Sequence, residues 1–253
     1  MRQGFTGKII LITGAGGGLG LAMAQRLASE GAELILSDVN GERLQASAQT
    51  LLEQQVCCRT VVADLAQESG IAALADSVCA DAAPLHGLIN NAGLAYGEVA
   101  HRFTGLGLAK WQHFLTVNSL APLLLAEALR PALARARGAI VNISSMASYA
   151  PATAYGVSKA TLNALNYGMA NAFAAEGIRV NAIAPGIMAT PASKGSLPAE
   201  TYARVQAQQL LPLHGEASDI AALAAFLLSE EARFITNELI SCDAGNRMRG
   251  WRL

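Results

Sequence analysis

Short apolar runs recur along the chain, and each one is followed by a longer stretch with helical character. The short runs are continuous and rich in β-branched residues, which is typical of strands that are buried on both faces of a sheet. The expected strands occupy residues 8–13, 33–38, 58–64, 85–93, 138–144, 178–186 and 237–243. The expected helices run from the first glycine turn to about Glu30 and over residues 40–54, 67–80, 108–135, 153–176 and 216–229.

This alternation of strands and helices predicts the fold class. A strand, a helix and a second parallel strand form a right-handed unit, and its repetition gives a doubly wound α/β sheet with helices on both faces. We therefore expect a seven-stranded parallel sheet in a single domain that spans residues 1–253. The segment 187–215 is rich in Ala, Ser, Pro, Gly and Gln, and we expect it to form a flap over a site.

Composition and charge exclude several classes of partner. The formal net charge is −1, only 15% of the residues are charged, and no basic or acidic block occurs, so neither nucleic acid nor a membrane surface is expected. The most apolar helical run, 120–136, is interrupted by Glu127, Pro131 and arginines, so it is too short and too charged to cross a bilayer. We expect a cytoplasmic protein.

The cysteines and histidines do not predict a metal site. The cysteines contain no C-x-x-C pair and are expected to be reduced, small buried side chains: Cys57, Cys58, Cys79 and Cys242. The histidines are scattered without metal-ligand spacing: His86, His101, His113 and His214. No metal is therefore expected.

A glycine-rich turn follows the first expected strand. Residues 13–20 read TGAGGGLG and open a helix, which is the context that a dinucleotide-binding fingerprint of the Rossmann fold requires. The first glycine suits a tight turn, the middle ones let the backbone approach a pyrophosphate, and the last allows close helix–strand packing. The predicted phosphate-binding residues are Gly14, Gly16, Gly17, Gly18, Leu19 and Gly20. A tight strand–helix turn without a ligand is the alternative.

The second expected strand ends at Asp38, 18 residues beyond Gly20. A carboxylate at this position can accept hydrogen bonds from the adenosine ribose and would repel a 2′-phosphate. Neither Gly17 nor Val39 offers a positive charge for that phosphate, so NAD(H) is favoured over NADP(H). The alternative role for Asp38 is a cap for the expected helix over 40–54.

Taken together and in order, these pieces resemble the short-chain dehydrogenase/reductase family, in its shorter branch, whose members have about the length of this chain. The resemblance covers nearly the whole chain. The matching pieces are TGAGGGLG at 13–20, Asp38, ADL at 63–65, NNAG at 90–93, Asn118, ISS at 143–145, YGVSK at 155–159 and IRVNAIAPG at 178–186.

The resemblance implies an NAD(P)-dependent oxidoreductase that acts on an alcohol or carbonyl, and it implies roles for individual residues. Asn118 would anchor a water relay behind Lys159, and Tyr155 would be the catalytic acid/base. Further residues would bind the cofactor beside Tyr155 and Lys159: Asp64 and Leu65 at the adenine, Asn91, Ala92 and Gly93 near the ribose, and Pro185, Gly186, Ile187 and Thr190 at the nicotinamide.

The chemistry of Tyr155 and Lys159 agrees with these roles. Tyr155 and Lys159 are four residues apart, so on a helix they share one face. A phenol with a pKa of about 10 is a poor base near neutrality. The Lys159 cation and the positive nicotinamide both favour the phenolate, and a catalyst poised nearer the working pH transfers protons better. An ordinary exposed pair is the alternative for these two residues in isolation.

The loop before Tyr155 departs from the family, and this leaves two candidates for the catalytic serine, Ser144 and Ser145. This loop is about three residues shorter than usual, and loops tolerate such deletions. Alignment from the strand side makes Ser145 the catalytic serine, which would hold the substrate oxygen, and makes Ser144 a strand-end residue. Ser148 and Tyr149 lie in the shortened loop, where they either fill space or touch the substrate.

A second departure lies near the C-terminus. Asn237 and Ala244 occupy positions where the family often has glycine, and we expect the fold to tolerate both. The final residues, RMRGWRL, either reach a neighbouring subunit or fray at the surface. The family is commonly tetrameric, so a homotetramer or homodimer is expected.

The sequence favours an NAD-dependent secondary-alcohol dehydrogenase or ketone reductase. A 3-oxoacyl carrier-protein reductase is the alternative within the class, although Asp38 argues against the NADPH that such relatives usually use. A non-catalytic NAD-binding regulator is the alternative outside it. The expected pocket, formed by 187–215 and 94–107, favours a neutral or partly apolar small-molecule substrate because it offers Tyr96, Phe103, Met188 and Tyr202.

Overall fold

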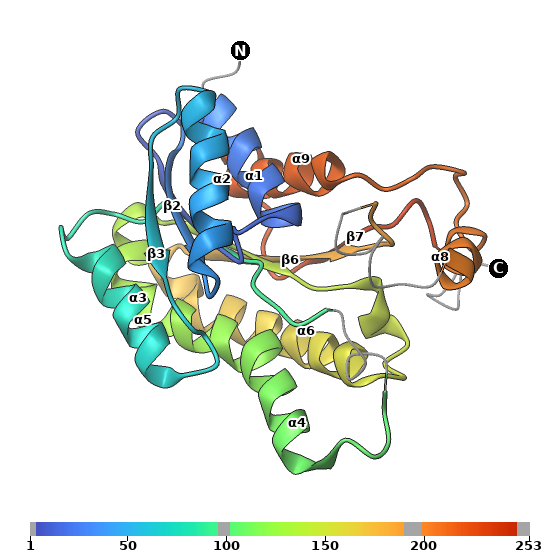
Figure 1. Cartoon of the computed structure of the whole chain (residues 1–253). Helices are drawn as coiled ribbons and strands as arrows, with labels where there is room; N and C mark the ends of the chain where they lie inside the picture. Colours follow the sequence, from blue (N-terminus) through green and yellow to red (C-terminus); the bar gives the residue numbers. More distant parts are fainter. Residues whose placement is uncertain (1–3, 96–101, 190–198, 247–253) are drawn as a thin grey trace.

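Seven parallel strands form the centre of the protein, in a computed structural model that describes residues 4–95, 102–189 and 199–246 (Figure 1). The strands are β1 (Ile9–Thr13), β2 (Glu33–Asp38), β3 (Cys58–Val62), β4 (Gly87–Asn90), β5 (Ala139–Ile143), β6 (Arg179–Pro185) and β7 (Leu239–Cys242). Their order is β3-β2-β1-β4-β5-β6-β7, and every neighbouring pair is parallel. The predicted doubly wound Rossmann fold is confirmed. The second strand has its predicted bounds, and the others are shorter.

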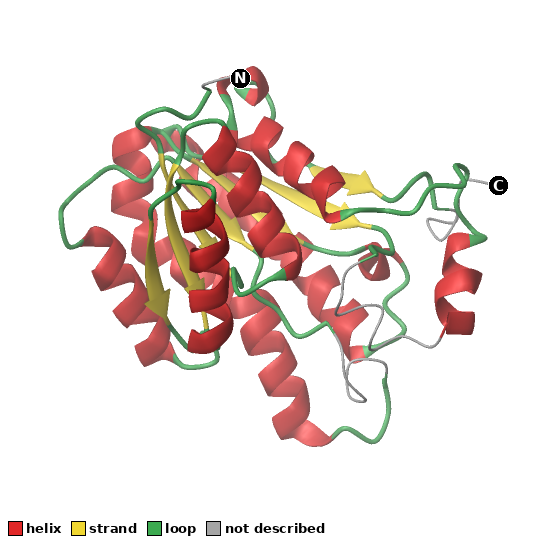
Figure 2. Ribbon diagram, turned by 45° about the horizontal axis from the view of Figure 1, so that its top comes forward, coloured by secondary structure: helices red, strands yellow, loops and turns green. Residues whose placement is uncertain are grey.

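Helices cover both faces of the sheet (Figures 1 and 2). The helices are α1 (Gly18–Ser29), α2 (Gly41–Glu53), α3 (Glu68–Cys79), α4 (Gly107–Leu115), α5 (Ala121–Ala136), α6 (Ala154–Phe173), α8 (Ala199–Gln206) and α9 (Ala217–Leu228). The short turns are a π-helix, η1 (Thr116–Leu120), and three 3₁₀ turns, η2 (Met146–Tyr149), η3 (Ala174–Glu176) and η4 (Glu230–Ala232). The helices α1, α2 and α9 pack on one face, and α3, α5 and α6 pack on the other. Among the described residues, no helix has both the length and the apolar character that crossing a bilayer requires.

The central strands β1, β4, β5 and β6 are largely apolar because both of their faces are buried, whereas the edge strand β3 is mostly exposed. In β1, Ile10 and Ile12 pack into the cluster beneath α1 and α9, whereas Leu11 packs into the cluster beneath α3 and α5. The same alternation occurs in β5, where Val141 and Ile140 point to opposite clusters. A sheet covered on both sides therefore produces the continuous apolar runs seen in the sequence.

The strand order places a topological switch point at the carboxyl ends of β1 and β4. The chain leaves β1 towards β2 on one side, and it leaves β4 towards β5 on the other. In open α/β sheets, ligands bind at such a switch point, where the two connections diverge. The glycine turn and the NNAG sequence follow these two strands, so the fold brings them to the same place.

The single long helix expected over residues 108–135 is divided by the π-helix η1. The Ala121 N–H donates to the carbonyl of Thr116, five residues earlier. Pro122 has no N–H with which to bind the carbonyl of Asn118, four residues earlier, so the α-helical pattern is interrupted there. Such single π-turns occur frequently at functional sites, and this one contains Asn118.

The shortened loop before Tyr155 packs tightly against the start of α6. Thr153 caps this helix by accepting a hydrogen bond from the Gly156 N–H at 3.0 Å, so the helix begins where the sequence predicts. A Cβ atom on Gly156 would lie 2.9 Å from the carbonyl oxygen of Ala147, which is closer than real Cβ contacts. The glycine therefore allows the backbone of η2 to lie directly against the helix.

Asn237 and Ala244, which stand where the family often has glycine, both adopt left-handed backbone conformations. Asn237 has φ of 65° and Ala244 has φ of 52°, a region that alanine rarely occupies. The carbonyl of Ala244 accepts hydrogen bonds from the N–H groups of Leu210 and Leu211 at 3.1 and 3.2 Å. The turn after β7 therefore fixes the end of the segment that contains α8.

That segment corresponds to the expected flap over 187–215, of which residues 190–198 lie outside the described part of the chain. Its two ends meet in an isolated parallel bridge between Met188 and Gly215. The Ala189 N–H donates to the Gly215 carbonyl at 2.7 Å. Figure 1 places α8 beyond the ends of β6 and β7. Its role as a flap stays a prediction.

Candidate active site

Most of the predicted site residues lie along the carboxyl edge of the sheet, because they stand at or just after the end of a parallel strand. The connections that carry them are the β1–α1 turn with Gly14, Gly16, Gly17, Gly18, Leu19 and Gly20, the end of β2 with Asp38, the segment after β3 with Asp64 and Leu65, the segment after β4 with Asn91, Ala92 and Gly93, the segment after β5 with Ser145, and the end of β6 with Pro185, Gly186 and Ile187. Asn118, Tyr155 and Lys159 lie instead in η1 and α6. Thr190 lies outside the described residues.

Hydrogen bonds between Thr13 and Asn91 hold the two sides of the switch point together. The Thr13 hydroxyl donates to the carbonyl of Ile89 at 3.3 Å and accepts from the N–H groups of Asn91 and Ala92, both at 3.1 Å. The Asn91 amide donates to the carbonyls of Thr13 and Gly14 at 3.0 and 2.9 Å. Sequence reasoning missed Thr13, although its place at the end of the first strand is a usable signal.

The glycine turn has a packed side and an open side. Gly14 has φ of 65°, and a Cβ atom on it would lie 2.7 Å from the Cα of Ala92. A Cβ atom on Gly20 would overlap the Gly14 carbonyl, whereas Cβ atoms on Gly17 and Gly18 would meet nothing within 4 Å. The first turn of α1 contains no acidic residue. The N-terminal amides of α1 and the open glycines therefore fit a pyrophosphate.

Asp38 connects the glycine turn to the start of α2. Its carboxylate accepts hydrogen bonds from the N–H groups of Gly16 and Asn40, both at 2.9 Å. The α2 cap is Asn40, which accepts from the Arg43 N–H at 2.9 Å, so the alternative role of Asp38 as the helix cap is wrong. Sequence reasoning also missed Arg43, whose Cβ lies 3.0 Å from the position of a Cβ on Gly16.

Lys159 lies buried beside Tyr155 on α6. Its ammonium donates to the carbonyl of Ile143, the last residue of β5, at 2.8 Å. The same nitrogen lies 5.9 Å from the centre of the Tyr155 ring. The side chain is only 4% exposed, and burial lowers the pKa of Lys159 to about 8. The group therefore remains largely protonated at pH 7.

Hydrogen bonds of the side-chain amide fix Asn118 next to Lys159. Its amide oxygen accepts from the Leu94 N–H at 2.7 Å, and its amide nitrogen donates to the Ser158 hydroxyl at 2.9 Å. The Ser158 hydroxyl in turn donates to the carbonyl of Tyr155 at 2.8 Å. A Cβ atom on Gly93 would lie 3.0 Å from the Asn118 oxygen and 3.3 Å from the Lys159 nitrogen, which explains the glycine there. The bridging role of Ser158 was not predicted.

The serines after β5 differ in how their hydroxyls are used. Ser145 caps η2, and its hydroxyl accepts from the Ala147 N–H at 3.1 Å. Ser144 donates its hydroxyl proton to the side chain of Asn163 at 2.5 Å. The phenol of Tyr149 is 2.7 Å from the hydroxyl of Ser241 in β7, so it connects the shortened loop to the sheet. The geometry favours Ser145 over Ser144 as the available donor.

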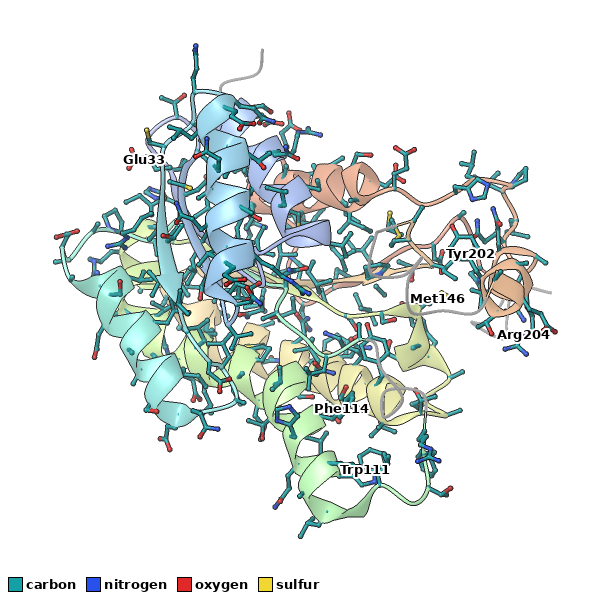
Figure 3. The ribbon with its side chains drawn as sticks, viewed as in Figure 1. Glu33, Trp111, Phe114, Met146, Tyr202 and Arg204 are labelled. Carbon is teal, nitrogen blue, oxygen red and sulfur yellow. The ribbon has the colours of Figure 1, made fainter. Side chains whose placement is uncertain are left out.

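An apolar cluster lies against the Tyr155 ring. Leu106, Phe114 and Ala154 are its buried members, and Leu94, Trp111 and Tyr155 pack on them. Figure 3 shows Trp111 and Phe114 extending from α4, and Tyr202 and Arg204 extending from α8.

Of the expected pocket residues, Met188 is buried beside Gly215, Phe103 meets the Trp111 ring edge-on at 5.8 Å, and Tyr202 stacks on His214 at 6.3 Å. Tyr96 lies outside the described residues.

Comparison with known proteins identifies the family. Residues 14–247 match the family model described as Enoyl-(Acyl carrier protein) reductase. The chain is 33% identical over 246 residues to a probable short-chain type dehydrogenase/reductase of Bradyrhizobium diazoefficiens, which covers 95% of this chain and 88% of the relative. The chain therefore belongs to the short-chain dehydrogenase/reductase family, whose members include dehydrogenases and reductases of alcohols and ketones.

Solved structures show the same fold over nearly the whole chain. A 7α-hydroxysteroid dehydrogenase in complex with NADH and 7-oxo glycochenodeoxycholic acid has a TM-score of 0.88 at 27% identity and covers 97% of this chain and 96% of that one. The L-sorbose reductase of Gluconobacter frateurii, in complex with NADPH and L-sorbose, has a TM-score of 0.87 at 28% identity, covering 97% and 98%. These neighbours differ in cofactor.

The buried Lys159 makes stability depend on pH. Its pKa of about 8 in the folded protein lies below the value of about 10.4 for an unfolded lysine. Between these values the unfolded chain binds more protons, so the free energy of unfolding rises with pH. Relative to Lys159→Met, the wild type should gain about 3 kcal/mol between pH 7.5 and 10.5. Urea unfolding of both proteins at each pH measures this gain, and parallel pH profiles would contradict it.

Proposed function

We propose that the protein is an NAD(H)-dependent oxidoreductase that interconverts a secondary alcohol and a ketone, with Tyr155 as the acid/base. One observation carries this proposal: a buried, protonated Lys159 lies beside the Tyr155 ring at the carboxyl edge of the sheet. Burying an ammonium against a neutral carbonyl is costly, and such perturbed groups cluster at functional sites. Family membership supports the same class of reaction.

The residues around the switch point would hold the cofactor. The α1 amides and the open side of the glycine turn would bind the pyrophosphate, and Asp38, Asp64 and Leu65 would hold the adenosine. Asn91, Ala92 and Gly93 would line the floor, and Pro185, Gly186, Ile187 and Thr190 would hold the nicotinamide end. When bound, the nicotinamide supplies the hydride acceptor or donor.

The chain's own residues would move and stabilise the proton. In oxidation, the Tyr155 phenolate takes the proton of the substrate hydroxyl, and in reduction the phenol returns it. The Lys159 ammonium stabilises the phenolate, since an adjacent positive charge favours the ionised form. Ser145 donates a hydrogen bond to the substrate oxygen. Asn118, fixed in the π-helix, anchors a water relay behind Lys159.

The relatives support a secondary alcohol or ketone as the substrate. Two structural neighbours were solved in complex with 7-oxo glycochenodeoxycholic acid and with L-sorbose, both of which carry a ketone. In this chain the apolar cluster beside Tyr155 favours a neutral or partly apolar substrate, with the segment 187–215 as a flap in the same single domain. The second candidate is 3-oxoacyl reduction. The matching family model is described as an enoyl-(acyl carrier protein) reductase, which acts on a carbon–carbon double bond, so it supports the acyl thioester of this candidate and not the reduction of its ketone.

Tyr155→Phe tests the catalytic proposal. Removal of the phenolic proton should lower kcat by about a hundredfold to ten-thousandfold, while NADH binding is retained. Initial rates on a panel of cyclic secondary alcohols, ketoses and a 3-oxoacyl thioester, with fluorescence titration of NADH, measure both. The matched control is Tyr149→Phe, because its hydroxyl binds Ser241 and should be dispensable for turnover.

Two outcomes contradict this proposal. A Tyr155→Phe variant that keeps most of its activity would exclude Tyr155 as the acid/base. A wild type that binds NADH but turns over none of the panel would favour a non-catalytic NAD-binding regulator.

We further propose that Asp38 makes NAD(H) the preferred cofactor. The carboxylate lies between the glycine turn and α2, fixed by two backbone N–H groups, and would face the ribose hydroxyls. A 2′-phosphate placed there would meet a negative charge. The positive charge of the nearby Arg43 would favour a 2′-phosphate, so the preference for NAD(H) over NADP(H) depends on both Asp38 and Arg43.

Asp38→Asn should narrow the cofactor preference. Asparagine keeps an oxygen for the Gly16 N–H but removes the charge, so the ratio of kcat/KM for NAD⁺ to that for NADP⁺ should fall by about tenfold or more. Steady-state kinetics with both cofactors measure the ratio. Arg43→Ala is the opposing control and should raise it. A wild type that uses NADP⁺ as well as NAD⁺ would contradict the proposal.

We propose that the protein is a homotetramer or homodimer. Large apolar side chains are exposed on one side of the molecule, on α4, η1, α5 and α6: Leu108, Leu120, Leu124 and Tyr167. Two further exposed aromatic side chains lie on and after α9: Phe226, and Phe234, which is 96% exposed. Exposed apolar groups of this kind mark contacts between proteins.

A variant with both Leu120→Glu and Leu124→Glu should dissociate, because two charges would be buried in the interface. Sedimentation velocity should show a smaller species than the wild type at equal concentration. Leu52→Glu, on the exposed side of α2, is the matched control and should leave the assembly unchanged. A wild type that sediments as a 26.2 kDa monomer would contradict the proposal.

We also propose a cytoplasmic location. All four cysteines are free thiols, which supports a reducing compartment.

A further inference from the structure

We propose that Asn163 is a positioning residue that orients the hydroxyl of Ser145 by holding the serines on either side of it. The inference rests on the proposed function, in which Ser145 binds the substrate oxygen. Asn163 lies on α6, one turn beyond Lys159 and two turns beyond Tyr155, so the three residues share one face of the helix.

The side-chain amide of Asn163 bridges the shortened loop. Its oxygen accepts from the Ser144 hydroxyl at 2.5 Å, and its nitrogen donates to the Ser148 hydroxyl at 2.9 Å. The Ser148 hydroxyl then donates to the carbonyl of Ser145 at 2.7 Å, and the Ser148 N–H reaches the same carbonyl at 3.1 Å. One amide group on the helix therefore fixes the chain immediately before and after Ser145.

The direction of these hydrogen bonds is determined by proton count. A serine hydroxyl has a single proton, and that of Ser148 goes to the Ser145 carbonyl. Ser148 must therefore accept from the amide nitrogen of Asn163, which turns the amide oxygen towards Ser144. Ser144 must then donate. Turning the amide over would leave the Ser148 hydroxyl without a donor from Asn163, so this orientation is the one that satisfies every group.

This arrangement leaves Ser145, within the part of the chain that the structure describes, as the serine of the three with an uncommitted proton. The protons of Ser144 and Ser148 go to Asn163 and to the Ser145 carbonyl. The Ser145 hydroxyl accepts from the Ala147 N–H, which fixes its oxygen and leaves its proton for another acceptor. Because all three serines are buried, these bonds meet little competition from water. Asn163 thus helps to determine which serine can act and where its hydroxyl lies.

The short loop explains why the hydrogen bonds from the Asn163 amide are needed. The loop between β5 and α6 is short, and its η2 turn lies against the helix at Gly156. A displaced donor loses much of its effect on the reaction, since small errors in placement are costly in catalysis. Asn163 lies on the same helix as Tyr155 and Lys159, so its hydrogen bonds fix the position of Ser145 relative to both of these residues.

A double-mutant cycle tests the inference on the full chain. Asn163→Ala should lower kcat by about tenfold to a hundredfold, while the NADH dissociation constant stays within about twofold. In a Ser145→Ala background, Asn163→Ala should have almost no further effect on kcat, because there is no hydroxyl left to position. Asn171→Ala is the matched control, since Asn171 lies exposed on the same helix and donates to the backbone carbonyl of Tyr167.

Ser148→Ala provides a second route that leaves α6 unchanged, and it should show the same dependence on Ser145 even if Asn163→Ala folds poorly. Equal losses of kcat with and without the Ser145 hydroxyl would overturn the inference and assign Asn163 to general stability. A loss of activity explained entirely by weaker NADH binding would overturn it as well.

The failure of the proposed function is distinguishable from these results. If the wild type shows no turnover, or if its turnover survives Tyr155→Phe, the proposed reaction is excluded. The role of Asn163 in positioning Ser145 for that reaction is then excluded as well. If the wild-type activity depends on Tyr155 but the effects of Asn163→Ala and Ser145→Ala on kcat are additive, only the positioning role of Asn163 is excluded.

Discussion

The hydrogen bond from the buried Lys159 ammonium to the carbonyl of Ile143 organises the candidate site. It joins the middle layer of the fold to the helix layer, because Ile143 ends β5 and Lys159 lies on α6. An ammonium removed from water must be compensated by its surroundings, and here the partner is a backbone carbonyl. Tyr155, one turn earlier, and Gly93, which leaves room beside the amine, are arranged around this charge.

The parts of the structure that the sequence predicts are those determined by local patterns. The central strands were found because burial on both faces makes them continuous apolar runs, as in β1 and β5. The position of most site residues at one edge of the sheet follows from parallel strands alone, whereas their order along this edge depends on the strand order β3-β2-β1-β4-β5-β6-β7. The division of the helix at Asn118 was missed, although Pro122 provides the reason for it.

The parts that could not be predicted depend on contacts between residues distant in sequence. Thr13 and Asn91 are 78 residues apart, yet their bonds close the switch point. The proximity of Arg43 to Gly16 depends on how α2 packs beside the first turn. The role of Asn163 depends on the geometry of a loop whose length the sequence showed but whose path it did not. The residues assigned to the cofactor and to catalysis stay predictions that rest on the family resemblance and on this geometry.

The contact between Met188 and Gly215 has a consequence for how much this part of the fold can vary in length. The segment between them leaves and rejoins the body of the protein at one point, and the turn at Ala244 holds it at a second. Because its ends are already together, a replacement of different length would change the closure entropy only slightly. The fold can therefore accept a segment of different length here while the sheet, the glycine turn and α6 stay unchanged.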